Sequence, residues 1–161
     1  MKDIEIIQYT DDYKQEVNEF IINIKLHEFD IDNVTYNNQP DLKNIMGTYI
    51  NTGGQFWLAL YEGKVVGTIA LVRLKDNNSA LKRVYVDQNT RNMKIGKKML
   101  DHVIKHAHDD GIKSIYLGTI DKFEAAQHFY RKNGFHLIPK EELPSDFPLV
   151  TVDNRFFYKD I

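Results

Sequence analysis

Cationic side chains gather at the start of one predicted helix, where helix electrostatics disfavours them. They follow a strand-like segment and continue into the first turn of the most regular helical pattern in the chain: Arg91, Lys94, Lys97 and Lys98. Because a helix N-terminus carries a partial positive charge, each cation there costs roughly a few tenths of a kcal/mol unless an anion compensates for it. Free amides at a helix start, with a glycine such as Gly96 that allows close approach, favour binding of phosphate or pyrophosphate. The alternative is that these side chains only solvate an exposed helix and that Gly96 serves packing.

Several other chemistries lose support because their motifs are missing. The sequence contains neither G-x-x-x-x-G-K-[ST] nor G-x-G-x-x-G, so neither a P-loop NTPase nor a dinucleotide-binding Rossmann domain is supported. It contains no G-x-S-x-G and no cysteine, which excludes disulfides, thiolate zinc sites and cysteine nucleophiles. His102 and His106 have the spacing of a metal pair, but Val103 stands where a zincin helix requires glutamate. We therefore expect an exposed helical face there and no metal site.

The length and composition predict one domain. With 161 residues and 42% apolar content the chain can fill a single core, so we expect one domain over residues 1–161. The formal net charge of −2 removes the positive field on which nonspecific nucleic-acid binding depends. The N-terminal residues have no signal-peptide pattern, and no apolar run approaches membrane-spanning length. We expect a cytoplasmic protein with neither a nucleic-acid nor a membrane partner.

The apolar pattern predicts strands and helices in a definite order. The expected elements are strand 4–7, helix 12–27, short helix 40–46, strands 56–61, 65–74 and 80–86, helix 95–109, strand 114–120, helix 123–132 and strand 150–158. Thr10 is the expected N-cap of the first helix, and the polar stretch 28–39 is expected to be a loop or a lid. Val84 and Val86 should lie on one face of their strand and Tyr85 on the other. The strands on either side of the 95–109 helix should run parallel.

Two segments resemble motifs of the GNAT superfamily of acetyl-CoA-dependent N-acetyltransferases. The stretch Arg91-Asn92-Met93-Lys94-Ile95-Gly96 is similar to the family's acetyl-CoA signature: Arg or Gln, two residues, Gly, one residue, then Gly or Ala. Its first and last positions match, whereas Lys94 replaces the middle glycine. The stretch from Ala126 to Phe135 is similar to the family's later helix, which ends in F-Y-x-x-x-G-F. The resemblance covers nearly the whole chain and is weakest between Glu28 and Gln55.

The resemblance implies a fold and a set of roles. The fold would be α/β (α+β), with a twisted, mostly antiparallel mixed sheet of six to seven strands, a central parallel pair and about four flanking helices. The cofactor would be acetyl-CoA, with the backbone of Val84, Tyr85 and Val86 pairing with its pantetheine arm. Its pyrophosphate would lie around the helix start, at Arg91, Met93, Lys94, Ile95, Gly96, Lys97 and Lys98. Tyr130 falls on the position of the general acid that protonates the departing thiolate, a task suited to a hydroxyl with a pKa above that of a thiol. An ordinary half-buried tyrosine is the alternative.

The general base stays open at this point. Many family members have a glutamate on the strand before the signature, where this chain has Ala80-Leu81-Lys82-Arg83. Asp121 and His128 are the nearest titratable residues to the expected cleft, and each has the alternative of being a solvated or capping residue. Because the chain has no cysteine for an acyl-enzyme, we expect a neutral amine to attack the thioester directly in a ternary complex.

The acceptor and the assembly are open as well. The region after the first helix contains the acidic residues Glu28, Asp30, Asp32 and Asp41. This charge favours a cationic acceptor such as a polyamine, an aminoglycoside or a peptide amine. The alternative is that the region is only a hydrophilic loop. The aromatic run 156–158 predicts core contacts or homodimer contacts. A non-catalytic acyl-CoA sensor is the rival interpretation, because Lys94 departs from the signature, Phe123 replaces a frequent asparagine, and the glutamate is missing.

Overall fold

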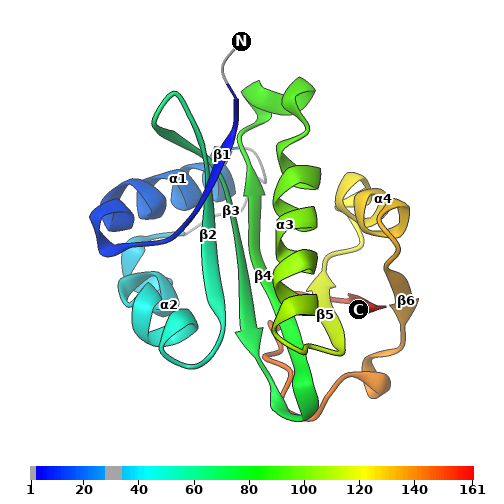
Figure 1. Cartoon of the computed structure of the whole chain (residues 1–161). Coiled ribbons are helices and arrows are strands. Elements are labelled where there is room, and N and C mark those ends of the chain that lie inside the picture. The colour runs from blue at the N-terminus through cyan, green and yellow to red at the C-terminus, as the bar shows by residue number, and fades with distance from the viewer. Residues whose placement is uncertain (1–2, 28–33) are drawn as a thin grey trace.

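The computed structural model describes residues 3–27 and 34–161, and of Arg91 the backbone. These residues form one seven-stranded sheet with the strand order β1-β2-β3-β4-β5-β7-β6 (Figure 1). The strands are β1 Glu5–Gln8, β2 Gln55–Tyr61, β3 Lys64–Arg73, β4 Asn78–Val86, β5 Ser114–Thr119, β6 His136–Ile138 and β7 Arg155–Asp160. β4 and β5 pair in parallel, and every other neighbouring pair is antiparallel. The predicted mixed sheet with a central parallel pair is confirmed.

Helices cover both faces of this sheet. The α-helices in the described part of the chain are α1 Lys14–His27, α2 Pro40–Lys43, α3 Ile95–Asp109 and α4 Glu124–Lys132. In Figure 1, α1 and α2 lie on one side of the sheet, and α3 and α4 lie on the other. Because successive strand residues point to opposite faces, β2 contributes Trp57 to the core under α3 and Phe56 to the core under α1. Burying a side chain of this size stabilises the fold by about 1.5–3 kcal/mol.

α3 follows its predicted bounds because its apolar positions recur at helical spacing. The residues that it buries are Ile95, Met99, Leu100, Val103 and Ala107. The helix ends at Asp109, and Gly111 takes a left-handed backbone (φ 73°) directly after it. The chain then enters β5, which runs parallel to β4 as predicted. The strand before the helix and the strand after it therefore lie side by side at the centre of the sheet.

Boundaries near the N-terminus differ from the predicted ones. Residues Asp11–Tyr13 form a 3-10 turn, so α1 begins at Lys14, and Thr10 makes no capping hydrogen bond with its side chain. α2 ends at Lys43, before the predicted end of that helix, and a π-helical turn follows at Met46–Ile50. Part of the expected loop or lid, residues 28–33, lies outside the described residues.

The prediction of a final strand at 150–158 is wrong at its start. Val150 and Val152 are 47% and 62% exposed, and β7 begins only at Arg155, opposite Thr119 of β5. Their residue types favour a strand, but a strand also needs a neighbour with which to pair. The short edge strand β6 pairs with β7 and is not anticipated by the apolar pattern. As a result, the segment before Arg155 is a loop at the end of β5.

Candidate active site

The parallel pair at the centre of the sheet opens along its length. β4 and β5 pair only between Asn78–Ala80 and Ser114–Tyr116, although β4 continues to Val86 and β5 to Thr119. Beyond Ala80, the two strands diverge, and no residue of β5 pairs with the backbone of β4. Backbone N–H and C=O groups on that edge of β4 can therefore bind an extended ligand.

A β-bulge interrupts β4 beside this opening. Thr68 of β3 pairs with Tyr85, whereas Ala70 pairs with Lys82, so β4 has one residue more than β3 over this stretch. Arg83 absorbs the extra residue with a left-handed backbone (φ 54°). Its carbonyl accepts a hydrogen bond of 2.8 Å from the Thr68 hydroxyl.

The bulge decides which side chains face which layer. Leu81 and Val84 both pack in the core under α3 although they are three residues apart, which regular alternation would forbid. Tyr85 packs with the core under α1, and Val86 with the core under α3. The predicted opposition of Tyr85 to the two valines is therefore confirmed. Lys82 shares the α1 face with its strand partner Ala70, because directly opposed residues point to the same side.

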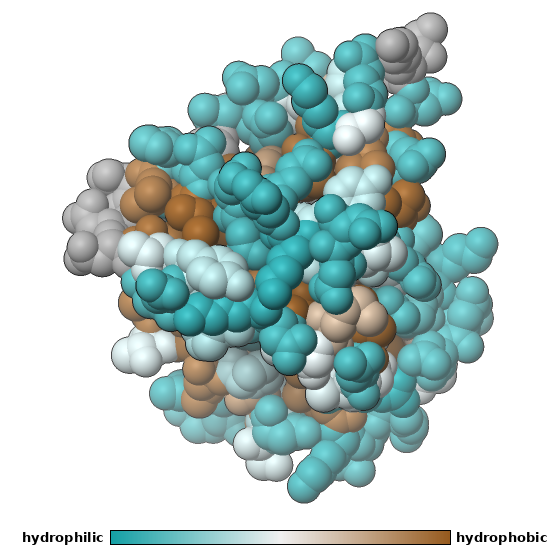
Figure 2. Space-filling model, turned by 90° about the vertical axis from the view of Figure 1, so that its left-hand side faces the viewer, coloured by the Kyte–Doolittle hydropathy of each residue, from teal (hydrophilic) through white to brown (hydrophobic). Residues whose placement is uncertain are grey.

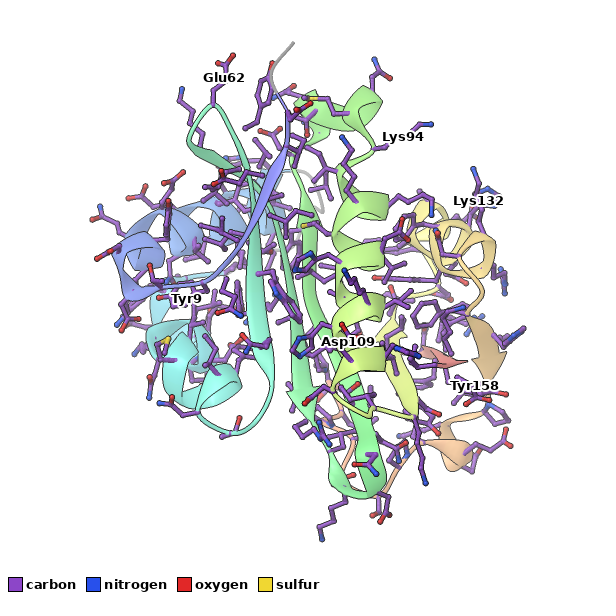
Figure 3. All side chains as sticks on the ribbon, in the orientation of Figure 1. Tyr9, Glu62, Lys94, Asp109, Lys132 and Tyr158 are labelled. Atoms are coloured by element: carbon purple, nitrogen blue, oxygen red, sulfur yellow. The ribbon has the colours of Figure 1, made fainter. Side chains whose placement is uncertain are left out.

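The start of α3 offers free backbone amides. The first α-helical hydrogen bond runs from the Lys98 amide to the Lys94 carbonyl, so the amides of Ile95, Gly96 and Lys97 have no partner within the helix. Lys94 precedes the helix with a left-handed backbone (φ 56°, ψ 38°) and makes no side-chain cap. This is the position of the middle glycine in the acetyl-CoA signature, and glycine adopts such a backbone without strain. Figure 3 shows Lys94 extending outward from this helix start.

Packing within the chain does not account for Gly96. A Cβ atom at Gly96 would lie 3.5 Å from the Phe129 ring and 3.8 Å from Val86 Cγ2, which are ordinary contact distances. Among the nearby cations, Lys97 Nζ lies 3.1 Å from a carboxylate oxygen of Asp101. No ion pair between described residues involves Lys94 or Lys98. The helix start thus keeps room, free amides and positive charge for an anion.

Tyr130 lies on α4 in an aromatic cluster. Its ring packs against Phe129, Phe135 and Phe157, with centroid separations of 5.5, 5.6 and 6.3 Å. Burial, and after it the nearby Tyr85 of β4, raise the pKa of the Tyr130 hydroxyl well above its ordinary value. No hydrogen bond joins this hydroxyl to the residues that the structure describes. Tyr130 is therefore a neutral proton donor that has no competing partner in that part of the chain.

An ion pair on the other side of the opening fixes the bulge. Arg83 binds Asp41 of α2 through Nη2 to Oδ1 at 2.6 Å and through Nε to Oδ2 at 2.9 Å. Tyr49 donates a hydrogen bond of 2.6 Å to Asp41 Oδ2, and Gln39 Oε1 accepts one of 2.9 Å from Arg83 Nη2. Burial alone would raise the pKa of Asp41, but the bonds and charge of Arg83 hold it below its usual value. The Asp41 carboxylate is therefore already paired.

A half-buried carboxylate and two lysines lie next to this ion pair. A Cβ atom on Gly118 of β5 would stand 2.7 Å from Asp153 Oδ2, so the carboxylate lies directly against that strand. Burial raises the pKa of Asp153, while the charges of Lys82 and Lys25 oppose the rise. Lys82 Nζ donates to the Pro148 carbonyl at 2.9 Å and lies 5.2 Å from the centre of the Phe147 ring.

The two candidate bases from the sequence are exposed, and the Asp121 amide donates a hydrogen bond of 2.8 Å to Asn154 Oδ1, next to Asp153 in the sequence. Asp121 is exposed after the end of β5, with a carboxylate oxygen 4.0 Å from Arg155 Nη2. His128 is exposed on α4, and its position two residues before the buried Tyr130 directs it to the opposite side of the helix. Among the described residues, no hydrogen bond or ion pair joins the Asp121 or His128 side chain to Asp153, Lys82 or Lys25.

The histidines of α3 contact an aromatic ring. His102 and His106 pack edge-on against Trp57, with ring centroids 5.8 and 5.0 Å apart. Within residues 3–27 and 34–161, no group of three His, Asp or Glu side chains is arranged to hold a metal ion. In the same ranges, every helix is too short or too polar to cross a membrane.

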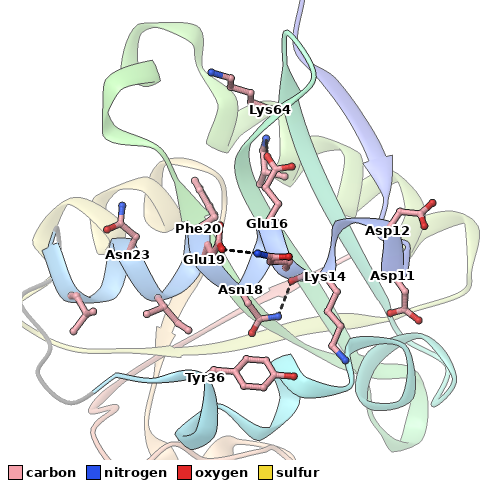
Figure 4. Close-up of a pocket in the computed structure, with 14 residues that line it drawn as sticks. Asp11, Asp12, Lys14, Glu16, Asn18, Glu19, Phe20, Asn23, Tyr36 and Lys64 are labelled. Carbon is pink, nitrogen blue, oxygen red and sulfur yellow. Dashed lines mark hydrogen bonds between the residues drawn. The ribbon is translucent and has the colours of Figure 1, made fainter.

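A separate hollow lies along the outer side of α1. Its volume is about 1050 Å³, and none of the site residues expected from the sequence lines it (Figure 4). Polar side chains in it already have hydrogen-bond partners. Gln15 donates to Glu19, Asn18 donates to the Lys14 carbonyl, and Glu16 accepts from the Val65 amide. Figure 2 shows this side of the molecule, where hydrophilic side chains predominate and apolar surface forms separate patches. We assign the chemistry to the opening between β4 and β5 because the free amides and Tyr130 gather there.

A comparison with protein families decides the identity of this arrangement. The model of the acetyltransferase (GNAT) family matches residues 18–135. The chain belongs to the GNAT acetyltransferase family. The seven-stranded sheet with its central parallel pair is the GNAT fold, as the resemblance in the sequence implied.

Individual GNAT relatives extend this result. An N-acetylaspartate synthetase from Danio rerio is 33% identical over 104 residues, covering 63% of this chain and 37% of that protein. A probable N-acetyltransferase, camello, from Xenopus tropicalis is 32% identical over 110 residues, covering 66% and 50%. The chain thus spans half or less of the length of these curated relatives.

Solved GNAT structures match over the whole chain. A GNAT acetyltransferase from Staphylococcus aureus Mu50 has 52% identity and a TM-score of 0.92, with 98% of both chains covered. The PaiA N-acetyltransferase from Thermoplasma acidophilum, in complex with coenzyme A, has the same fold at 20% identity, with a TM-score of 0.79 and 99% of both chains covered.

The site residues expected from the sequence do not include Lys25, Lys82 or Asp153 on the α1 side of the opening. Asp153 falls within the predicted strand 150–158, so the pattern treats it as a strand residue. Lys25 lies in the last turn of α1, and Lys82 lies directly before the bulge, opposite Ala70 of β3. The one available signal in the sequence is Ala80-Leu81-Lys82-Arg83, which lacks the glutamate that many GNAT proteins have on this strand.

Proposed function

We propose that this GNAT protein is an N-acetyltransferase that moves the acetyl group of acetyl-CoA to a primary amine. The observation that carries the proposal is the opening between β4 and β5, with free amides at the start of α3 and the buried Tyr130 of α4 beside it. Family membership and the names of relatives, such as the probable N-acetyltransferase camello, support the class of reaction. Two proteins of the same fold have been solved with coenzyme A and with acetyl-CoA.

The residues beside the opening fit the cofactor. The unpaired edge of β4 at Val84, Tyr85 and Val86 would pair with the amide groups of the pantetheine arm. The pyrophosphate would lie against the amides at the start of α3, from Met93 to Lys98, with Arg91 and the exposed lysines adding charge. The absence of a packing reason for Gly96 supports this assignment, because a side chain there would occupy the space of a bound anion.

The reaction that we propose is direct transfer. The ammonium group of the acceptor first loses a proton to a base, and the neutral nitrogen attacks the thioester carbonyl carbon. The C–N bond forms, the C–S bond breaks, and the thiolate takes a proton from the Tyr130 hydroxyl. The proton that leaves the new amide nitrogen restores the hydroxyl, so one proton is released to solvent for each acetyl group transferred.

Tyr130 suits the acid role because it stays protonated. Its raised pKa keeps the hydroxyl protonated until a thiolate forms beside it, and that thiolate is the acceptor of its proton. Asp121 and His128 remain predictions for the base, and both would have to act through water because they are exposed. Asp153 is a half-buried carboxylate that lies against Gly118 on the β5 side of the opening.

Further properties remain proposals. A cationic acceptor rests on Glu28, Asp30 and Asp32, which lie outside the described residues, and on Asp41, which Arg83 already neutralises. A single domain over residues 1–161 is supported by the one sheet that both ends of the described chain join. A homodimer and a cytoplasmic location are predictions from the sequence alone.

The first experiment measures thiol release from acetyl-CoA with a panel of amines, and binding of coenzyme A in parallel. Acceptor-dependent release together with coenzyme A binding is the expected result. Binding of coenzyme A without thiol release for any amine would favour the rival function, a non-catalytic acyl-CoA sensor. The observation that favours this rival is Lys94, which has a strained left-handed backbone where the signature has glycine. Failure to bind coenzyme A would refute both.

A further inference from the structure

Ionisable side chains from separate parts of the chain gather on the α1 side of the opening. They are Lys25 of α1, Asp41 of α2, Lys82 and Arg83 of the β4 bulge, and Asp153 of the loop before β7. Gln39 Oε1 links two of them, because it lies 3.4 Å from Lys25 Nζ and 2.9 Å from Arg83 Nη2. Arg83 and Asp41 neutralise each other through their two short contacts. Two lysines and one carboxylate remain, so this group of described residues keeps an excess of positive charge.

The two lysines are held by neutral oxygens. Lys25 Nζ lies 3.4 Å from Gln39 Oε1, and Lys82 Nζ lies 2.9 Å from the Pro148 carbonyl. No ion pair within 4.0 Å joins either lysine to Asp153 among the described residues. Burial lowers the pKa of both lysines, and the charge of Arg83 adds to this effect, while the charges of Asp41 and Asp153 oppose it. Each ammonium keeps donors for a further partner, and a half-buried cation is stabilised strongly by an anionic one.

Asp153 lies on the opposite side of the opening, against β5. Its carboxylate stands against Gly118 of β5, whose missing side chain leaves the space that the carboxylate occupies. Gly118 is two residues after Tyr116, so the two residues point to the same face of β5. Tyr116 packs on the face opposite to the core under α3, which is also the face of Lys82 and Tyr85. Asp153, which lies against Gly118, therefore covers this face. A ligand between β4 and β5 would therefore meet cations on one side and a carboxylate on the other.

We infer that the acceptor is an amine that also carries a carboxylate, which Lys25 and Lys82 bind, and that Asp153 takes the proton from its ammonium group. This inference rests on the proposed acetyltransferase function and adds the substrate class and the base. The proton passes from the acceptor nitrogen to Asp153 Oδ and then to solvent before the nitrogen attacks the thioester. Tyr130 protonates the leaving thiolate and regains its proton from the new amide, so the steps balance.

The first test compares matched amines with acetyl-CoA in a thiol-release assay. Amino acids and short peptides with a free carboxylate are paired with their amides, which keep the amine and lose the negative charge, and polyamines are included. Loss of the carboxylate should lower kcat/KM by about tenfold or more, as for one or two charge-assisted contacts. Equal or better use of the amides or of polyamines would overturn the assignment while leaving the transferase function intact.

Two lysine variants locate the contact. Lys25→Gln and Lys82→Gln should each raise KM for the carboxylate acceptor about tenfold and leave KM for its amide and for acetyl-CoA unchanged. Lys105→Gln on the exposed side of α3 is the matched control and should change neither. Variants that keep the full preference for the carboxylate would show that these lysines do not bind it.

The role of Asp153 has its own signature in the pH profile. Lys25 from α1, Lys82 and Tyr85 from β4, and Gly118 from β5 surround this carboxylate. Asp153→Asn should lower kcat about a hundredfold near neutral pH, with partial recovery at high pH where the amine loses its proton unaided. KM for the carboxylate acceptor should not rise, because the variant removes a negative charge beside the lysines. A loss that is equal at every pH would reject Asp153 as the base.

A binding measurement keeps the substrate class testable without turnover. Complexes with coenzyme A are heated with carboxylate amines or their amides, and only the carboxylate forms should raise the melting temperature. If thiol release is absent for every amine but this shift is present, the transferase function fails and the carboxylate site stands. If both are absent, the carboxylate site is rejected.

Discussion

The two sides of the opening between β4 and β5 are built in different ways. The cofactor side consists of neighbours in the sequence, from the end of β4 at Val84 through the start of α3 at Lys98, joined by Tyr130 of α4. The α1 side combines four segments that are far apart in the sequence, from Lys25 to Asp153. Only the β4 bulge belongs to both sides, since Arg83 faces Asp41 while Val84 packs under α3.

The difference follows from what each side binds. A pyrophosphate is recognised by amides at a helix start, so a short stretch of backbone is sufficient and can appear as a motif. An acceptor is recognised by side chains that the fold must bring together, and these can change without altering the cofactor side. The family relationship therefore supports the proposed reaction, whereas the contacts of Lys25, Lys82 and Asp153 are the basis for the proposed acceptor.

The largest effect should come from Tyr130→Phe, which removes one oxygen from the cofactor side. We expect turnover to fall by about a hundredfold or more, in the range for a lost general acid. The affinity for coenzyme A should stay within about twofold, because the phenyl ring keeps the packing against Phe135 and Phe157. Steady-state kinetics and calorimetric titration measure the two quantities. An equal loss in both would show that Tyr130 is a structural or binding residue only.

The ion pair that fixes the bulge gives the next largest effect. Arg83 and Asp41 side chains are 13% and 22% exposed, so Arg83→Met leaves a partly buried carboxylate without its partner. We expect a loss of about 2–4 kcal/mol in the free energy of unfolding, measured with denaturant, somewhat below the range for a fully buried pair. Arg73→Met is the matched control, because its pair with Asp110 is 28% and 47% exposed and should contribute about 0–1 kcal/mol.

Acid titration sharpens the same comparison. The pKa of Asp41 is depressed in the folded protein, so its stabilisation is complete above the ordinary aspartate pKa and disappears as pH falls through the lower folded value. The Arg83→Met variant should lose this pH dependence, and the difference between variant and parent should shrink toward low pH. A constant difference at all pH values would mean that the guanidinium acts mainly through packing.

The strand and the helix that form the proposed cofactor side follow from the sequence, whereas the arrangement on the α1 side does not, for physical reasons. The pattern Ile95, Met99, Val103 and the cations before it locate α3 and its free amides, because helix periodicity and charge are local properties. The bulge at Arg83 depends on the register between β3 and β4, which no local pattern contains. The start of β7 depends on where β5 offers a strand with which to pair. The apolar residues Val150 and Val152 therefore led to the prediction of strand structure before Arg155, where the structure has none.

A pair of glycines separates the two sides directly. Gly96→Ala meets Phe129 and Val86 only at ordinary distances, so the fold should tolerate it, while the affinity for coenzyme A should fall about tenfold. Gly118→Ala would bring a methyl group within 2.7 Å of Asp153 Oδ2 and should displace that carboxylate. It should lower kcat with the acceptor and leave coenzyme A affinity unchanged. Coenzyme A titrations and acceptor kinetics on both variants check this crossed pattern, and a loss of coenzyme A affinity in Gly118→Ala would contradict it.

The smallest effect should come from Lys94→Gly, which restores the middle glycine of the signature. Glycine adopts the left-handed backbone of this position (φ 56°) without strain, so the free energy of unfolding should rise by about 0.5–1 kcal/mol. If the Lys94 ammonium also attracts the pyrophosphate, coenzyme A affinity should fall about two- to fivefold at low ionic strength, and the difference should vanish as salt screens it. Lys94→Ala is the control, because it removes the charge and keeps the strained backbone. A gain in stability with equal affinity at every salt concentration would assign Lys94 no part in cofactor binding and leave the amides of α3 as the anion site.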